Sequence, residues 1–145
     1  MHAVDILVPP LLHVLRTPSL PVALRSSALT ILAACAEQSP LSLLAHRQML
    51  VDACLDLLST ESRSSRTMLM KDETPDPLET ASTHPSLRRG AILFIGLMLR
   101  AAPEQFGRKV LGRMQAVLGY LKATDEDPLV RHNAGEVLED CGALL

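Results

Sequence analysis

The chain has 145 residues, enough for one domain, and 48% of them are hydrophobic. Only 2% are aromatic, so the apolar content is almost entirely aliphatic, which favours helices over a β-sandwich or barrel. A formal net charge of −2 gives no overall field that would draw the protein onto nucleic acid or an anionic membrane. The 3 cysteines lie among apolar residues and indicate free thiols in a reducing compartment.

The first expected element is a helix over residues 4–16, whose apolar residues surround the pair Pro9 and Pro10. A second helix is expected in LPVALRSSALTILAA from Leu20, because apolar residues recur there at the spacing of one helix face. Together these helices form a first pair over about residues 3–38.

The second pair is expected over about residues 40–101. It begins with a helix over 41–58 and ends with HPSLRRGAILFIGLM from His84. Between them, residues 59–84 are rich in serine, threonine and charge and have no sustained apolar period. We expect a mostly disordered insertion there.

The third pair is expected over about residues 103–145, with one helix over 104–123 and another in EDPLVRHNAGEVLED from Glu126. The second helices of the three pairs align without gaps, so that Arg25, Arg88 and Arg131 coincide. Arg88 and Arg131 lie 43 positions apart, a typical length for a repeat of two helices. The sequence therefore predicts a single all-α domain over 1–145, an α-solenoid of three helix pairs (six helices) with the insertion in the second pair.

The aligned arginines are predicted to join neighbouring repeats. Such a side chain can pair with an acid or a carbonyl of the adjacent turn, and the third turn offers acids, Asp127 among them, whereas the turn at 17–19 offers none. The predicted stacking residues are therefore Arg25, Arg88, Arg131 and Asp127. The alternative is a row of arginines that bind anions.

No pattern of catalytic residues is present. The histidines are scattered, no CxxC or glycine-rich phosphate loop occurs, and no apolar run approaches the ~20 residues of a membrane span. The sequence predicts no enzyme, no catalytic residue, no metal, no cofactor, no small-molecule substrate and no membrane span. The basic clusters at 88–100 and 108–113 are short, so nucleic-acid binding is the less favoured alternative.

The repeats resemble the HEAT superfamily, a group of armadillo-like helical repeats, over nearly the whole chain outside 59–84. Two stretches, LRRGAILFIGLMLRAAP from Leu87 and TDEDPLVRHNAGEVLEDCG from Thr124, resemble a narrower family. That family is the one required for nuclear transport of RNA polymerase II, related to transport and Golgi organisation protein six, in its C-terminal region. The residues that carry the resemblance are Arg88, Arg89, Asp125, Asp127, Val130, Arg131, Ala134, Leu138 and Glu139, while Gly90 stands where the family has alanine.

The resemblance implies a cytoplasmic adaptor that can shuttle to the nucleus and helps RNA polymerase II subunits assemble or enter it. RNA polymerase II subunits or transport factors are the implied protein partners. In HEAT stacks the second helices line a concave face, so the expected partner-binding residues are Arg89, Leu93, Arg100, His132, Glu136 and Glu139. Apolar residues at both ends of the chain suggest a piece of a longer scaffold, and the alternative is a module that associates with itself.

Overall fold

The computed structural model of the protein describes residues 3–70 and 84–145, with the backbone alone for 63–70. These residues form six α-helices and two 3-10 helices, and the described part of the chain contains no strand. The α-helices are α1 (Ala3–Leu15), α2 (Val22–Gln38), α3 (Arg47–Met70), α5 (Pro85–Ala101), α6 (Arg108–Thr124) and α7 (Pro128–Leu144), and the 3-10 helices are η1 (Pro40–His46) and η2 (Pro103–Gln105). The prediction of an all-α fold with six helices is confirmed.

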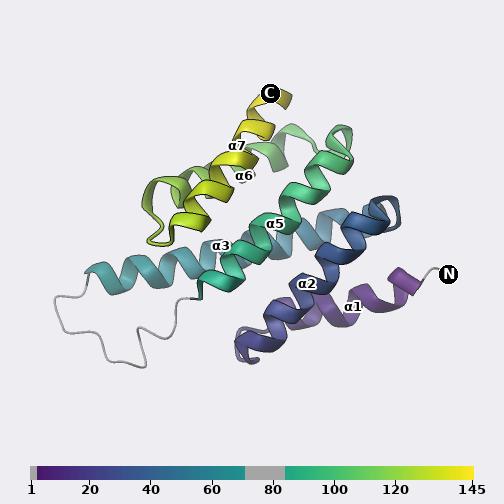
Figure 1. The fold of residues 1–145 in the computed structure, drawn as a ribbon, viewed down its shortest axis with the longest axis horizontal. Helices are drawn as coiled ribbons and strands as arrows, with labels where there is room; N and C mark the ends of the chain where they lie inside the picture. Colours follow the sequence, from purple (N-terminus) through teal and green to yellow (C-terminus); the bar gives the residue numbers. More distant parts are fainter. Residues whose placement is uncertain (1–2, 71–83) are drawn as a thin grey trace.

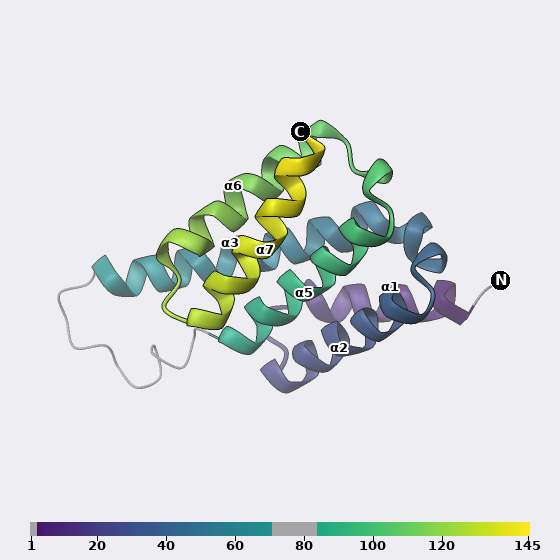
Figure 2. The ribbon, with the colours of Figure 1, turned by 45° about the horizontal axis from the view of Figure 1, so that its top comes forward.

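The helices lie in two layers (Figure 1). One layer holds α2, α5 and α7, and the other holds α1, α3 and α6. Figure 2 shows the same order from a second direction, with α5 between α2 and α7. Each helix of one layer packs on its partner in the other, which gives the pairs α1–α2, α3–α5 and α6–α7.

Helix α1 forms although Pro9 and Pro10 lie inside it. A proline inside a helix lacks an N–H and so removes one backbone hydrogen bond. Both prolines are exposed to water, while the opposite side of the helix buries Val8, Leu12 and Leu15 against the core. Packing of this apolar side therefore holds α1 together where its backbone hydrogen bonding is incomplete.

The helix expected over 41–58 differs from the structure at both ends. Its first part is the 3-10 helix η1, where Leu43 is fully buried and α3 begins only at Arg47. Its far end continues to Met70, so residues 59–70 are helical and the prediction that they belong to a disordered insertion is wrong. Residues 71–83, the rest of the predicted insertion, lie outside the described residues.

The extension of α3 has a physical reason in the side chain of Glu61. This residue is only 6% exposed, and its Oε2 accepts a hydrogen bond of 3.2 Å from the backbone N–H of His84, just before α5. The same oxygen lies 3.5 Å from the guanidinium of Arg88. The helix therefore carries a buried carboxylate to the start of α5.

The helix expected over 104–123 is likewise divided. Residues 103–105 form η2, Phe106 has extended backbone angles, and α6 begins after Gly107. The Phe106 ring is only 6% exposed, and the guanidinium carbon of Arg47 lies 5.2 Å from its centroid. Burial of this ring separates the two helical segments.

Helix α5 lies at the centre of the hydrophobic core, which extends from α1 to α7. Its buried side chains include Leu87, Phe94, Ile95 and Met98, each with no exposed surface. Burial of an aliphatic or aromatic side chain of this size contributes about 1.5–3 kcal/mol, so α5 supplies much of the core's stability.

Two glycines allow neighbouring helices to approach α5 closely. A Cβ atom at Gly90 would lie 3.1 Å from Leu29 Cδ1 of α2, and one at Gly96 would lie 3.1 Å from Val137 Cγ2 of α7. Both distances are shorter than ordinary van der Waals contact. The absence of a side chain at these two glycines therefore allows α2 and α7 to pack closely against α5.

Candidate protein-binding surface

The predicted site residues fall into two groups, a set of ion pairs at the α6–α7 turn and an exposed surface on α5 and α7. In the first group, Arg88 projects from the first turn of α5 and meets Asp125 at the end of α6. Its Nε and Nη2 atoms donate to the two carboxylate oxygens of Asp125 at 2.8 and 3.1 Å. Arg88 and Asp125 are 4% and 9% exposed, so this is a buried, two-point ion pair between adjacent helix pairs.

Asp127 organises the same turn. Its Oδ2 accepts a hydrogen bond of 2.9 Å from the N–H of Val130, which caps the N-terminus of α7. Arg89 donates to both carboxylate oxygens of Asp127, at 2.8 and 2.6 Å. These hydrogen bonds, led by those from Arg89, lower the pKa of Asp127 to about 2, and Asp127 in turn raises the pKa of Arg89.

The pairing of Arg89 changes the interpretation of its predicted role. The side chain is 41% exposed, as a binding residue should be, but its guanidinium already pairs with Asp127. Arg89 therefore lies with Asp127 in the ion pairs of the turn, and the structure does not leave it as a free charge on the α5–α7 surface.

The other two aligned arginines make different contacts from Arg88. Arg131 Nη1 donates to the backbone carbonyls of Asp125 and Glu126 at 2.7 and 3.3 Å, within its own helix pair. Arg25 is only 8% exposed, and in the described part of the chain its side chain has no hydrogen bond or ion pair. The three arginines thus share a position in the repeat but differ in contacts: Arg88 binds the carboxylate of Asp125, Arg131 binds its backbone carbonyl, and the Arg25 side chain has no partner among the described residues.

The second group forms a continuous exposed surface, the α5–α7 surface. It consists of Leu93, Arg100, His132, Glu136 and Glu139. Arg100 on α5 bridges to Asp140 on α7, with Nε 3.0 Å from Oδ2, and this exposed pair shows that the two rows of residues face the same side. Of these residues Leu93 is the large apolar one, and it is 48% exposed.

Exposed charges of both signs lie on α5 and α7 together with Leu93. His132 Nε2 lies 3.2 Å from Glu136 Oε1, one turn apart on α7, and both side chains are more than half exposed. Glu139 is exposed beside them. The α5–α7 surface therefore combines one exposed leucine with mixed charges, a composition suited to a protein and unsuited to a polyanion.

Sequence analysis missed a chain of ion pairs in the other layer. Arg16, after α1, lies 3.0 Å from Asp56 Oδ2 on α3, and Arg113 of α6 lies 2.5 Å from Asp56 Oδ1. Arg113 also lies 3.4 Å from Asp52. Partial burial raises the pKa of Asp56, but the hydrogen bonds from Arg113 and Arg16 outweigh burial and leave that pKa below its ordinary value.

The three cysteines are free. Cys54 and Cys141 are fully buried and Cys35 is half-buried. Burial raises the pKa of the Cys54 thiol to about 12 against the opposing charge of Arg16, and burial with the nearby Asp140 raises that of Cys141. These two thiols are therefore protonated near neutral pH.

Residues 3–70 and 84–145 bring no three potential metal ligands (His, Cys, Asp or Glu) together. No helix in the same residues combines the length and the apolar content of a membrane span.

Comparison of the chain with protein-family models, with curated proteins and with solved structures finds no match. The function of the domain is therefore inferred from its own residues.

Proposed function

We propose that this domain is a protein-binding scaffold that catalyses no reaction, built as a segment of a HEAT-type α-solenoid. Two features support the solenoid: the second helices repeat in sequence, and α2, α5 and α7 lie side by side in one layer. Solenoids of this kind present the surface of one helical layer to their partners. By resemblance, the partners are RNA polymerase II subunits or transport factors, and the protein acts in the cytoplasm and shuttles to the nucleus.

The observation that carries the proposal is the α5–α7 surface. Leu93 is 48% exposed on the helix whose other side forms the centre of the core, so the helix that presents it is firmly held. Exposed charges lie on the same helix and on the adjacent α7. An apolar residue with a charged rim on a rigid element is the usual composition of a protein-binding site.

Affinity capture with matched variants tests this surface. Leu93→Asp together with Arg100→Glu should abolish binding of purified RNA polymerase II subunits, measured by pull-down and by interferometry. The control makes the same two kinds of change in the opposite layer, Tyr120→Asp with Arg108→Glu on α6, where both side chains are exposed.

Equal loss in both double variants would point to a general charge effect and contradict the proposed surface. If other proteins bind through Leu93 and polymerase subunits do not, the proposed scaffold function stands and the proposed partner is rejected. Arg89 is left unchanged, because its reversal would place a second acid beside Asp127, the half-buried N-cap of α7. The pair of Arg100 and Asp140 is exposed at both residues, so reversal of Arg100 should affect stability little.

A self-associating module is the second candidate, and it rests on a different set of residues. Ile6 is 63%, Leu41 73% and Met49 55% exposed, and they lie on α1, η1 and α3, which pack together. Burial of such side chains between two copies would be favourable. Sedimentation velocity over a range of concentrations decides this point, since a constant sedimentation coefficient excludes the candidate.

The structure does not favour nucleic-acid binding by the two basic clusters. Arg88, Arg89, Arg100 and Arg113 are each paired with an aspartate. A phosphate backbone would have to displace these carboxylates, which leaves Arg108 and Lys109, both exposed on α6, as the residues of the two clusters that no described acid pairs.

A further inference from the structure

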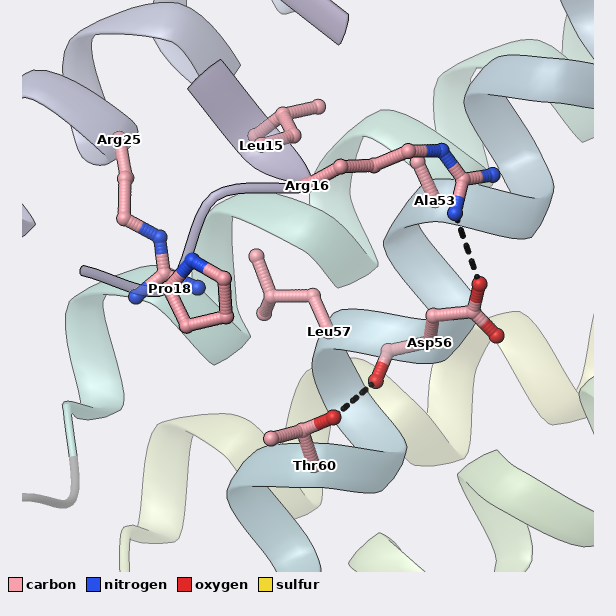
Figure 3. Close-up of a pocket in the computed structure, with 8 residues that line it drawn as sticks. All are labelled: Leu15, Arg16, Pro18, Arg25, Ala53, Asp56, Leu57 and Thr60. Carbon is pink, nitrogen blue, oxygen red and sulfur yellow. Dashed lines mark hydrogen bonds and ion pairs between the residues drawn. The ribbon is translucent and has the colours of Figure 1, made fainter. Parts of the chain in front are cut away.

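A cavity of about 100 Å³ opens beside the turn that joins α1 to α2 (Figure 3). Leu15, Ala53 and Leu57 form its apolar wall, and Pro18 lies at the turn itself. Because a water molecule occupies about 30 Å³ of liquid, the cavity has room for a carboxylate group or a few waters.

Arg25 is the unusual residue of this cavity. It is 92% buried, its Nε is completely enclosed without a hydrogen-bond partner, and within the described residues no acid pairs with its guanidinium. Arg25 and Pro18 both line the cavity, and the guanidinium and the proline ring overlap in the view of Figure 3. A buried charge without a partner is costly, and such groups are normally paired.

The chain itself shows what normally occupies this position. Arg88 aligns with Arg25 in the repeat, and its guanidinium binds both oxygens of Asp125 from the next helix pair. On α3 the cavity is lined by Ala53, Leu57 and Thr60, which carry no charge, and by Asp56. The nearby carboxylate Glu61 is directed instead to Arg88 and His84.

The remaining charges of the cavity are already balanced. Arg16 pairs with Asp56, as the dashed line in Figure 3 shows, and Arg113 reaches the other oxygen of the same carboxylate. Asp56 is therefore held away from Arg25 by two other arginines. Among the described residues that line the cavity, one positive charge is left without a counter-ion, that of Arg25.

We propose that this cavity binds a carboxylate, which pairs with Arg25 as Asp125 pairs with Arg88, and that an acidic side chain of a protein partner supplies it. A guanidinium and a carboxylate match in a planar, two-point hydrogen-bonded pair, which favours this anion over a halide ion. The protein source of the carboxylate rests on the proposed scaffold function, whereas binding of a carboxylate at Arg25 does not.

A titration followed by NMR tests the proposal on the complete ¹⁵N-labelled chain. The probe is a capped tripeptide with a central glutamate, Ac-Ala-Glu-Ala-NH₂, and the control is the same peptide with glutamine. The Nε–H signal of Arg25, assigned by its loss in Arg25→Met, should shift downfield and saturate with the glutamate peptide only. Acetate and inorganic phosphate are titrated separately as free anions.

Two pairs of variants locate the site. Arg25→Met should weaken the glutamate peptide by about tenfold or more, whereas Arg108→Gln should change its affinity little, because Arg108 is exposed on α6 and does not line the cavity. Pro18→Glu should supply a carboxylate to the cavity from within the chain, melt at a higher temperature than its neutral match Pro18→Gln, and block the peptide. Pro18→Gln should leave the peptide bound, and because Pro18 is exposed, this pair decides the matter even if Arg25→Met fails to fold.

Several results would overturn the proposal. The absence of a saturable shift, or equal shifts with the glutamate and glutamine peptides, removes the carboxylate site. Tighter binding of phosphate than of the glutamate peptide would mean a phosphate site, and tighter binding of acetate would reject a protein as the source. If the α5–α7 variants bind partners normally but the glutamate peptide still binds at Arg25, the proposed surface fails and the carboxylate site stands.

Discussion

Asp127 shows at the scale of one residue how a single carboxylate can set the geometry of a turn. Its carboxylate accepts hydrogen bonds from the backbone N–H of Val130, at the start of α7, and from Nε and Nη2 of Arg89 on α5. Because its pKa of about 2 lies below the ordinary 3.8, the folded state releases this proton more readily than the unfolded state does. The resulting stabilisation is complete above about pH 4 and is lost as the pH falls toward 2.

Replacement of Asp127 by asparagine isolates that charge, since asparagine caps helices about as well as aspartate. At pH 7 Asp127→Asn should lower the urea midpoint, because Arg89 loses its ionic partner. Near pH 2 the wild-type side chain is itself becoming neutral, so the two midpoints should converge. Midpoints measured from pH 7 to pH 2 check this, and a constant gap between the two proteins would contradict it.

The buried pair of Arg88 and Asp125 acts at the scale of the element, since it fastens α5 to the end of α6. Asp125→Ala should destabilise the protein by about 3–5 kcal/mol, because it leaves a buried guanidinium without its main partner. Arg88→Met combined with Asp125→Ala should be less destabilising than Asp125→Ala alone, because no unpaired charge remains. Chemical denaturation of the wild type, of Arg88→Met, of Asp125→Ala and of the double variant measures the difference in the free energy of unfolding.

The position of α5 in the core gives a second prediction at this scale. Ile95 has no exposed surface, so Ile95→Ala should cost about 2–5 kcal/mol. Leu138 on α7 is only partly buried, and the buried residue beside it is Val137. Leu138→Ala should therefore cost less, below about 2 kcal/mol, and an equal loss at both positions would contradict this packing.

The elements that sequence analysis predicted best are those that repeat. The second helices α2, α5 and α7 align in sequence and lie in one layer, and the acids of the turn at 125–127 indicated a partner for an arginine such as Arg88. The two ends of α3 were not predicted. Its start depends on the burial of Leu43 in η1, and its extension depends on contacts of Glu61 with His84 and Arg88, which are distant in sequence. The composition of residues 59–70 does not indicate such contacts.

The candidate surface was predicted less completely than the fold. Helical spacing identified the exposed side chains of Leu93, Arg100 and Glu139, because exposure follows from which side of the helix is apolar. It could not show that Arg89 would pair with Asp127, since that contact depends on how closely two helix pairs approach. For Arg25 the sequence showed that the turn at 17–19 offers no acid, but it could not show that the guanidinium would be buried.

The whole molecule is held together by two connections that cross all three helix pairs. One is the hydrophobic core, which runs from Val8 of α1 to Cys141 of α7. The other is the ion-pair chain in which Asp56 of α3 joins Arg16, after α1, to Arg113 of α6. The first helices of the pairs do not align with one another in sequence, so nothing in the repeat pointed to this second connection.

A continuous core of this kind should unfold in one cooperative transition, although arrays of repeats can unfold in parts. Two natural reporters lie far apart in the fold, the only tyrosine, Tyr120 on α6, and the half-buried thiol of Cys35 on α2. In urea, tyrosine fluorescence, accessibility of the Cys35 thiol and far-UV circular dichroism should share one midpoint. Calorimetry should give equal calorimetric and van't Hoff enthalpies, of about 100 kcal/mol for a chain of this length. Ile95→Ala in the central helix should move all three midpoints together, whereas separate shifts at α2 and α6 would mean that the helix pairs fold as independent units.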